Sequence, residues 1–273
     1  MSFTRVTRAK VCPVCKRGDW CRVFDDGWAE CMRVRSDKPA RSGGWMHRVA
    51  ERGQGAFAQA PPPHRPPPGI NATAIHRAWL ANTKTEVLAA FAAELGVSAP
   101  ALAAVGAAWA PQYAAWAFPM CDGYGNVIGI RLRNERGKFA VRGSRQGIFL
   151  PWEGERPCEP KVPPESGKVL FVCEGPTDTA AALDLGFFAA GRPNCCCGGL
   201  EVRTYARRHE CARAVVVSDN DKPGLDGARK VGAELRMPYA IYVPPAKDLR
   251  EFCRLGGSRN MIENTLKGTV WNL

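Results

Sequence analysis

From residue 168 onward, short apolar runs alternate with helical patterns, and this alternation limits the fold more than any other feature of the chain. Strands are predicted over residues 169–173, 187–190, 214–218 and 240–243. Helices are predicted over residues 178–185, 202–208, 227–236 and 248–255. Strands and helices that alternate at this spacing predict an α/β fold, with a mostly parallel sheet covered by helices.

Acidic residues follow three of these predicted strands directly. They form the segments Glu174-Gly-Pro-Thr-Asp178, Asp219-Asn-Asp221 and Lys247-Asp248. Ligands of open α/β sheets bind at the carboxyl edge of the strands, so these carboxylates should gather there. Oxygen ligands suit Mg²⁺ or Mn²⁺, and a metal held in this way commonly meets phosphate. The alternative is that the acids are surface or helix-capping residues, and Asp178 in particular occupies an N-cap position.

Four cysteines near the N-terminus have metal-ligand spacing. Cys12-Pro-Val-Cys15 is a CxxC knuckle, followed by Cys21 and Cys31. Strands predicted over residues 20–24 and 28–33 flank Asp25-Asp26-Gly27, a hairpin signal that places Cys21 opposite Cys31. Four thiolates suit a tetrahedral Zn²⁺, which would stabilise a short segment with little core of its own. His47 is the alternative to Cys21 as the fourth ligand.

The chain has 12 cysteines, and its N-terminus lacks the apolar stretch of a secretory signal. We therefore expect reduced cysteines and a cytoplasmic protein. Cysteines other than the first four, including Cys195-Cys196-Cys197, are expected to be simply buried. No run approaches 18 apolar residues, so no membrane span and no membrane partner are expected.

Positive charge is concentrated at the start of the chain. The net charge is +12, and residues 1–70 hold 13 Lys and Arg against 6 Asp and Glu, which predicts a polyanionic partner. Arg17, Arg22, Arg33 and Arg35 accompany Trp20, Trp28 and Trp45. These tryptophans either stack on the bases of single-stranded DNA or form a small core of their own.

A proline-rich run, Pro61-Pro-Pro-His-Arg-Pro-Pro-Pro68, favours an extended spacer rather than a helix or a central strand. We therefore predict a small β module of the zinc-ribbon type over residues 1–53 and a linker over 54–70. An α+β subdomain is predicted over residues 71–160, and the α/β domain over 161–273.

The 71–160 region combines helical and strand signals. A helix is predicted over residues 85–95, with Val87, Leu88, Phe91 and Leu95 on one face and Gly96 as its end. Ser98 is expected to cap a short second helix. The two helices form either a plain helical hairpin or a DNA-binding helix-turn-helix. Strands are predicted over residues 117–120 and 127–132, which form a hairpin, and over 138–142 and 147–150.

The acidic segments resemble the Toprim domain that primases, topoisomerases and some nucleases share. The resemblance covers residues 165–255, and Ser218-Asp-Asn-Asp-Lys-Pro-Gly-Leu-Asp-Gly-Ala228 is most similar to the primase form. It implies that Asp219 and Asp221 bind the catalytic divalent ion and that Glu174 acts as an acid/base or metal ligand. Asp178 and Asp248 match outer positions of the metal site.

The layout also resembles that of bacterial and phage-type primases, in which a zinc module that contacts the template precedes the Toprim domain. The second cysteine pair here is Cys-x9-Cys, whereas a second CxxC is commoner in that family. Residues 118–149 resemble the N-terminal part of phage-type primase cores. The resemblance implies that basic residues there and beside the acids bind template and nucleotides. They are Arg131, Arg133, Lys138, Arg142, Lys222 and Lys247.

The function expected from these resemblances is that of a DNA primase, a nucleotidyltransferase that synthesises short primers on single-stranded DNA from nucleoside triphosphates. A Toprim nuclease and a non-catalytic recombination mediator are the alternatives. The chain has no GxxxxGK[ST] phosphate loop, so a replicative helicase would be a separate partner. This short architecture is typical of a phage or another mobile element.

Overall fold

The structure is a computed structural model that describes residues 2–40, 42–49, 58–59, 69–153, 156–157 and 169–272. The chain divides into two compact units, Met1–Pro66 and Pro67–Leu273. The proline run predicted to be a linker lies outside the described residues, and the domain boundaries stay a prediction. Among the described helices, none has the length and apolar character that crossing a membrane requires.

The first unit contains a four-stranded antiparallel sheet. Its strand order is β1 (Phe3–Arg5), β3 (Arg22–Phe24), β4 (Trp28–Cys31) and β5 (Trp45–Arg48). A separate pair joins β2 (Lys10–Val11) to β6 (Ala58–Gln59). The predicted turn lies between β3 and β4, with Gly27 at a φ of +82°. Arg22 pairs with Glu30, so continuing the register places Cys21 opposite Cys31, as predicted.

Small residues and cysteines form the core of this unit. Its buried members are Val6, Cys12, Cys21, Val23, Ala29 and Cys31. The tryptophans lie outside this buried cluster, so the alternative in which they make up the core is wrong. Trp20 is 79% exposed, whereas Trp28 and Trp45 are half-buried.

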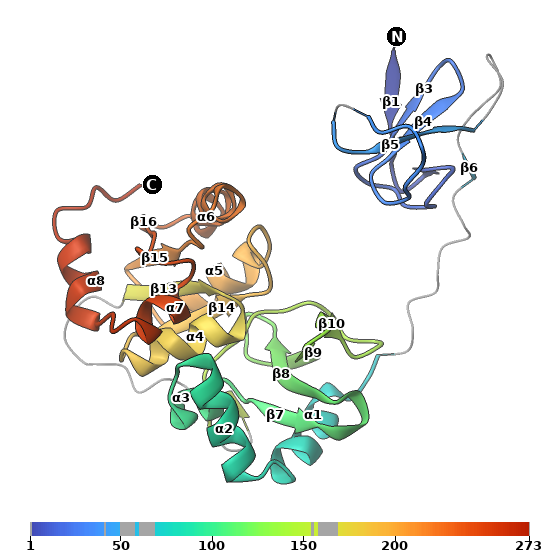
Figure 1. Cartoon of the computed structure of the whole chain (residues 1–273). Coiled ribbons are helices and arrows are strands. Elements are labelled where there is room, and N and C mark those ends of the chain that lie inside the picture. Colours follow the sequence, from blue (N-terminus) through green and yellow to red (C-terminus); the bar gives the residue numbers. More distant parts are fainter. Residues whose placement is uncertain are drawn as a thin grey trace. The chain divides into compact units, whose positions relative to one another are not determined.

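Three helices open the second unit (Figure 1). They are α1 (Ala72–Ala81), α2 (Thr85–Leu95) and α3 (Ala99–Ala104). Helix α2 ends at Gly96, which has a φ of +71°, and the Ser98 hydroxyl caps α3 by accepting the Ala101 N–H. Both features were predicted. Helix α1 was not, and Val87 is 42% exposed rather than part of the buried face.

An antiparallel sheet follows these helices. Its strands are β7 (Ala108–Ala110), β8 (Ala115–Cys121), β9 (Val127–Asn134) and β10 (Gly137–Ala140). A 3₁₀ turn, η1 (Pro111–Tyr113), connects β7 to β8, and a short pair joins β11 (Trp152–Glu153) to β12 (Arg156–Pro157). The predicted hairpin is therefore confirmed as β8 and β9.

The strand predicted over residues 147–150 is wrong. Ile148 forms a single bridge to Cys121, and Phe149 forms one to Gly191. This segment therefore connects the antiparallel sheet to the parallel sheet that follows, instead of extending either as a strand.

The parallel sheet has the order β14 (Ala189–Arg192), β13 (Val169–Glu174), β15 (Arg213–Val217) and β16 (Tyr239–Tyr242). All three strand pairings are parallel, which confirms the predicted fold class. The helices of this region are α4 (Gly175–Asp184), α5 (Gly199–Arg208), α6 (Lys222–Leu235), α7 (Leu249–Arg254) and α8 (Arg259–Leu266). Helix α8 was not predicted.

Both faces of the parallel sheet are covered, as a buried parallel sheet requires. Phe171 and Cys173 of β13 point into a core with α4, α7 and α8, whereas Leu170 and Val172 point into a core with α5 and α6. The first core also contains Phe118 and Met120 of β8. Thus the antiparallel sheet and the parallel sheet share one hydrophobic core, which fixes β9 relative to α4.

Candidate active site and metal centre

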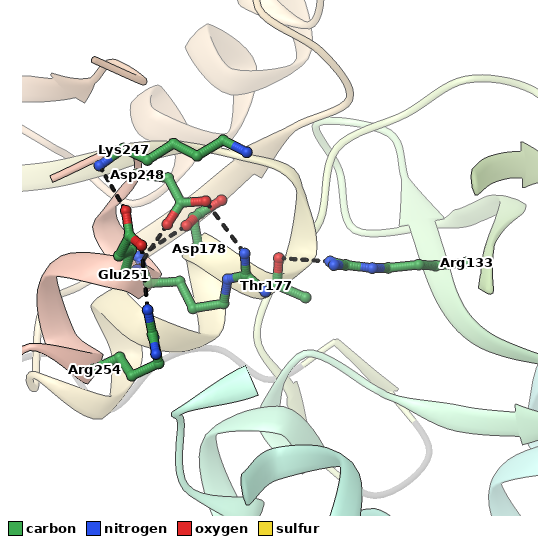
Figure 2. A network of polar contacts seen from close by, with 8 residues as sticks. Arg133, Thr177, Asp178, Lys247, Asp248, Glu251 and Arg254 are labelled. Atoms are coloured by element: carbon green, nitrogen blue, oxygen red, sulfur yellow. Dashed lines mark hydrogen bonds and ion pairs between the residues drawn. The ribbon is translucent and has the colours of Figure 1, made fainter. Parts of the chain in front are cut away.

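The predicted acids lie at the carboxyl edge of the parallel sheet. Glu174 is the last residue of β13, Asp219 follows β15 by two residues, and Asp248 precedes α7. The loops that carry the last two are joined by a hydrogen bond of 2.8 Å from the Asn220 N–H to the Lys247 carbonyl. Figure 2 shows Asp178 and Asp248 side by side at this edge.

Asp178 is buried inside the first turn of α4. Its Oδ1 accepts the backbone N–H of Arg250 at 3.0 Å. Burial, followed by the charge of Asp248, raises the pKa of Asp178 to about 7. The N-cap alternative for Asp178 is wrong, because α4 begins at Gly175 with Glu174 as its N-cap residue.

Asp219 is half-buried, and its neighbours are mostly acidic. Burial, followed by the charges of Glu174, Asp248 and Asp221, raises the pKa of Asp219 to about 6, while Arg192 opposes this rise. Carboxylates that raise one another's pKa lie in a shared field of negative charge. The mutual effects of these acids on their pKa values thus indicate that they lie close together at one edge of the sheet.

Asp221 and Asp248 both cap helices. Asp221 Oδ1 accepts the Gly224 N–H at the start of α6, and Asp248 Oδ1 accepts the Glu251 N–H at the start of α7, each at 2.7 Å. The capping interpretation therefore holds for these two residues. Each cap uses one oxygen of the carboxylate. The other oxygen of Asp248, Oδ2, lies 3.3 Å from the Arg250 guanidinium.

The acid cluster fits a divalent cation with oxygen ligands. Glu174 Oε2 is buried and has no hydrogen-bond partner within the described part of the chain, and the Arg192 guanidinium, 3.9 Å away, offers it an ion pair without a hydrogen bond. The acidic ligand atoms are spread too widely to form a group within 4.8 Å of one another. Such spacing is compatible with Mg²⁺, which usually keeps several water ligands and binds one or two carboxylates directly.

Arg192 is the site residue that sequence analysis missed. It ends β14 directly beside Glu174, and its side chain is completely buried. The guanidinium donates to the carbonyls of Val217, at 3.0 Å, and Cys195, and it lies 3.9 Å from Glu174 Oε2. A buried cation therefore joins the ends of β13, β14 and β15 and offsets part of the acidic charge.

The predicted basic residues occupy different environments. Arg131 and Arg133 share one face of β9 but are half-buried, and burial lowers the pKa of each. Arg133 donates to the Thr177 hydroxyl at 3.3 Å, which brings β9 to the residue before Asp178 (Figure 2). Lys138 lies opposite Arg133 on β10 and is exposed.

The other predicted basic residues are exposed. Arg142 lies in a turn after β10, and Lys247 in the loop before α7. The Lys222 ammonium forms an ion pair of 3.0 Å with Asp226, one turn further along α6. Arg133 is joined to α4 by its hydrogen bond to Thr177, and a wider basic surface around the acids remains a prediction.

The four predicted cysteines form a compact cluster in the first unit. Their sulfur atoms all lie within 4.8 Å of one another, and among the described residues this is the one such group of potential ligands. Sulfur atoms around a tetrahedral Zn²⁺, with Zn–S bonds of about 2.3 Å, lie about 3.8 Å apart. The sulfurs of Cys15 and Cys21 are 3.7 Å apart, so the cluster fits such an ion.

Burial raises the pKa of Cys12 and raises that of Cys21 to about 12, whereas hydrogen-bond donors around the cluster act in the opposite direction and favour thiolates. The backbone N–H groups of Met32 and Val34 point at Cys21 and Cys31 at 3.5 and 3.3 Å. Burial opposes ionisation of Cys15, but hydrogen bonds from the Arg17 backbone and from neighbouring thiols lower its pKa to about 7. The Arg33 guanidinium lies 4.0 Å from Cys15 and 3.9 Å from Cys21.

His47 is not part of the cluster. Its Nε2 contacts the Val34 carbonyl at 3.0 Å, and the compact group contains Cys21 instead. The prediction that Cys195, Cys196 and Cys197 are buried is wrong, because Cys196 is exposed and the other two are half-buried.

The raised pKa values give a prediction about stability in the absence of metal. Because the folded state raises the pKa of Asp178 from 3.8 to about 7, protonation favours folding, and this contribution is lost as pH rises from about 4 through 7. We expect the melting temperature of the chelator-treated chain to fall over this interval and to fall less in Asp178→Asn. Differential scanning calorimetry at several pH values measures both slopes, and equal slopes would contradict the burial of this charge.

Comparison with known proteins places the fold. No family model matches the chain, and no curated protein is similar to it in sequence. The catalytic core of the primase DnaG superposes with a TM-score of 0.52 at 12% identity, covering 74% of this chain and 81% of that one. The DnaG catalytic domain bound to ssDNA gives 0.50 at 13% identity, covering 72% and 80%.

A third solved structure contains the zinc-binding and RNA polymerase domains of the Aquifex aeolicus primase. It gives a TM-score of 0.53 at 11% identity and covers 74% of this chain and 63% of that one. The fold is therefore similar to that of the DnaG catalytic core, and the carboxyl-edge acids described above lie in the part of the chain that has this fold. At these identities the similarity is one of fold.

Proposed function

We propose that the chain is a DNA primase, a nucleotidyltransferase that joins nucleoside triphosphates into short primers on a single-stranded DNA template. The observation that carries the proposal is the charge-coupled set Glu174, Asp178, Asp219 and Asp248 at the carboxyl edge of a primase-type sheet. The DnaG domain solved with ssDNA supports single-stranded DNA as the template class.

In this proposal the acids hold a divalent ion, Mg²⁺ or Mn²⁺. Asp219 and Asp221 are its first ligands, Asp178 and Asp248 lie at the outer positions, and Glu174 is either a further ligand or the general base. When bound, the ion stabilises negative charge that develops on the transferred phosphate. Glu174, with one buried oxygen free of hydrogen bonds, is the candidate to accept the proton of the attacking 3′-hydroxyl.

The arginines of β9 bind the phosphates in this proposal. Arg133 is held at the acids by its hydrogen bond to Thr177, and the buried Nε of Arg131 lacks a partner among the described residues. Guanidinium groups suit bidentate contacts with phosphate oxygens, so both can position an incoming triphosphate. Lys138, Arg142, Lys222 and Lys247 are exposed and are proposed to contact the template or the nucleotides.

The cysteine cluster is proposed to hold a structural Zn²⁺. Four sulfur ligands without an open position are typical of structural rather than catalytic zinc sites. Reduced cysteines in such a site fit a cytoplasmic protein. A separate replicative helicase is proposed as a protein partner.

One experiment separates the proposal from its alternatives. The chain is incubated with labelled single-stranded DNA, nucleoside triphosphates and Mg²⁺ or Mn²⁺, and the products are sized on a denaturing gel. New short products support a primase, template cleavage without synthesis supports a Toprim nuclease, and binding without either reaction supports a recombination mediator.

Arg192 gives a prediction for the same reaction. Removing the buried cation in Arg192→Met should raise the pKa of Asp219, because Arg192 now opposes its neighbours' charges. We expect the pH at half-maximal synthesis to move upward in Arg192→Met and to move less in Arg192→Lys, which keeps the charge. Initial rates between pH 5 and 9 measure the shift. A profile that loses height without moving would mean that Arg192 only supports the fold.

A further inference from the structure

Arg250 lies inside the acid cluster, although the proposed metal chemistry gives it no role. It is the second residue of α7, directly after Leu249. Its backbone N–H donates to Asp178 Oδ1 at 3.0 Å, and its guanidinium lies 3.3 Å from Asp248 Oδ2. The Arg250 side chain is 25% exposed, so this ion pair is largely withdrawn from solvent. Arg250 therefore joins two acids that belong to different parts of the chain.

These two acids form the part of the cluster that could bind a second divalent ion. Asp178 and Asp248 lie side by side (Figure 2). One oxygen of each accepts a backbone N–H, from Arg250 and Glu251 respectively, which leaves each carboxylate a second oxygen. Two neighbouring carboxylates and several waters suffice to hold Mg²⁺. Polymerases and nucleases commonly hold two such ions about 4 Å apart.

Arg250 already supplies a cation at this position. Its guanidinium faces the Asp248 oxygen that the helix cap leaves free. Burial and the charge of Asp248 raise the pKa of Asp178, whereas the N–H and the charge of Arg250 lower it. The guanidinium thus acts on both carboxylates in the way that a metal ion would. Because like charges repel, it also opposes the binding of a second cation there.

The other acids of the cluster lie beyond this ion pair. Asp219 lies in the electrostatic field of Glu174 and Asp221, and the Arg192 guanidinium is 3.9 Å from Glu174. These three acids remain available to a divalent ion in the proposed site. The cluster therefore has one side for a metal and another side that an arginine of the chain neutralises.

The stability of α7 does not explain an arginine at this position. Residues in the first turn of a helix lie at the positive end of its dipole, where a cation is unfavourable. The buried Nε of Arg250 also has no hydrogen-bond partner among the described residues, which costs free energy. The contacts that account for the position of Arg250 are those with Asp178 and Asp248.

We propose that Arg250 takes the place of a second divalent ion. The chain by itself then holds one such ion, on the side of the cluster formed by Glu174, Asp219 and Asp221. This inference rests on the proposed function, because it concerns the ion used in primer synthesis. A guanidinium neutralises carboxylates and donates hydrogen bonds to phosphate oxygens, as a second ion would, but chelators cannot remove it.

The test counts ions bound to the full-length, zinc-loaded chain without nucleotides. Mn²⁺ is titrated in, and the free ion is measured by electron paramagnetic resonance. We expect about one Mn²⁺ per unmodified chain and about two in Arg250→Gln, because the substitution frees the second site. Arg250→Lys keeps the positive charge and should bind about one. Adding Asp178→Asn to Arg250→Gln removes a ligand of the second site and should return the count to about one.

Arg254→Gln is the matched control. It removes the same charge one turn further along α7, where Arg254 pairs with Glu251 at 3.2 Å and is largely exposed (Figure 2). Its Mn²⁺ count should equal that of the unmodified chain. Melting temperatures measured with and without Mn²⁺ provide a second readout. Arg250→Gln should melt lower without the ion and gain more from it, because an ion that binds the folded state stabilises it.

The outcomes separate this inference from the proposed function. Two ions on the unmodified chain would overturn the role of Arg250 whatever the variants do, and so would equal counts for it and folded Arg250→Gln. Primer synthesis by the unmodified chain, assayed in parallel, would leave the primase proposal standing in both cases. The expected counts without primer synthesis would support the role of Arg250 and contradict the primase. No bound ion would overturn the role of Arg250 together with the proposed metal site.

Discussion

Asp219→Asn is expected to lower primer synthesis by about a thousandfold, the scale on which enzymes depend on electrostatic stabilisation of a developing charge. Asparagine has the shape of aspartate but cannot supply the negative charge that a divalent ion needs. Burial and neighbouring acids already raise the pKa of Asp219 to about 6, so the substitution removes repulsion from the fold. We therefore expect an unchanged or higher melting temperature together with the loss of activity.

Asp226→Asn is the matched control for this prediction. Asp226 lies on the exposed side of α6, where it pairs with Lys222 and Arg229, and it is not one of the acids at the sheet edge. The same chemical change there should leave synthesis within about twofold, as is usual for surface ion pairs. Steady-state rates at saturating template measure both variants. Synthesis in Asp219→Asn at the rate of the control would show that this carboxylate does not hold the catalytic ion.

The second large effect is expected from Cys12→Ser. Cys12 is completely buried in the cysteine cluster, and the core around it consists of a few small residues. Structural zinc contributes about 10 kcal/mol to the folding of such small units. We expect the variant to lose its zinc and the first unit to unfold, while the second unit, which has its own core, stays folded.

Zinc content by mass spectrometry and two-step thermal unfolding measure this effect, with Cys196→Ser as the control. Cys196 is exposed and lies outside the cluster, so its substitution should keep the metal. We further expect Cys12→Ser to start few primers on bare template yet to extend an annealed primer. Full zinc content in Cys12→Ser would contradict the four-cysteine site.

The sequence predicted the parts of this site that depend on local patterns. Apolar runs followed directly by acids located Glu174 and Asp219 at the sheet edge, since a strand must be buried and its end is where the chain turns. The Asp-Asp-Gly turn set the register that places Cys21 opposite Cys31. Ser98 and Gly96 marked helix ends because capping depends on one or two residues.

Features that depend on tertiary contacts could not be predicted in this way. Arginine is usually a surface residue, so the sequence offers no reason to expect Arg192 to be buried. Its burial follows from the acids and carbonyls that three separate strands bring around it. Helix α4 begins three residues earlier than the pattern indicated, because Gly175 adopts a φ of +78° directly after the strand. The segment at Ile148 and Phe149 looks like a strand but bridges two sheets.

The exposure of Trp20 could not be predicted from the sequence either. Its size and apolar character suit a core position, and the sequence left open whether the tryptophans pack inside or bind DNA. Its left-handed backbone and exposed ring, next to a metal-ligand cysteine, are properties of the folded unit alone.

The most direct test of the central claim is the sequence of the products. Purified chain is given single-stranded DNA of mixed sequence, four nucleoside triphosphates and Mg²⁺, and the short products are cloned and sequenced. We expect products complementary to the template, formed only with divalent metal and absent in Asp219→Asn. Products unrelated to the template, or fragments of the template itself, would contradict that claim.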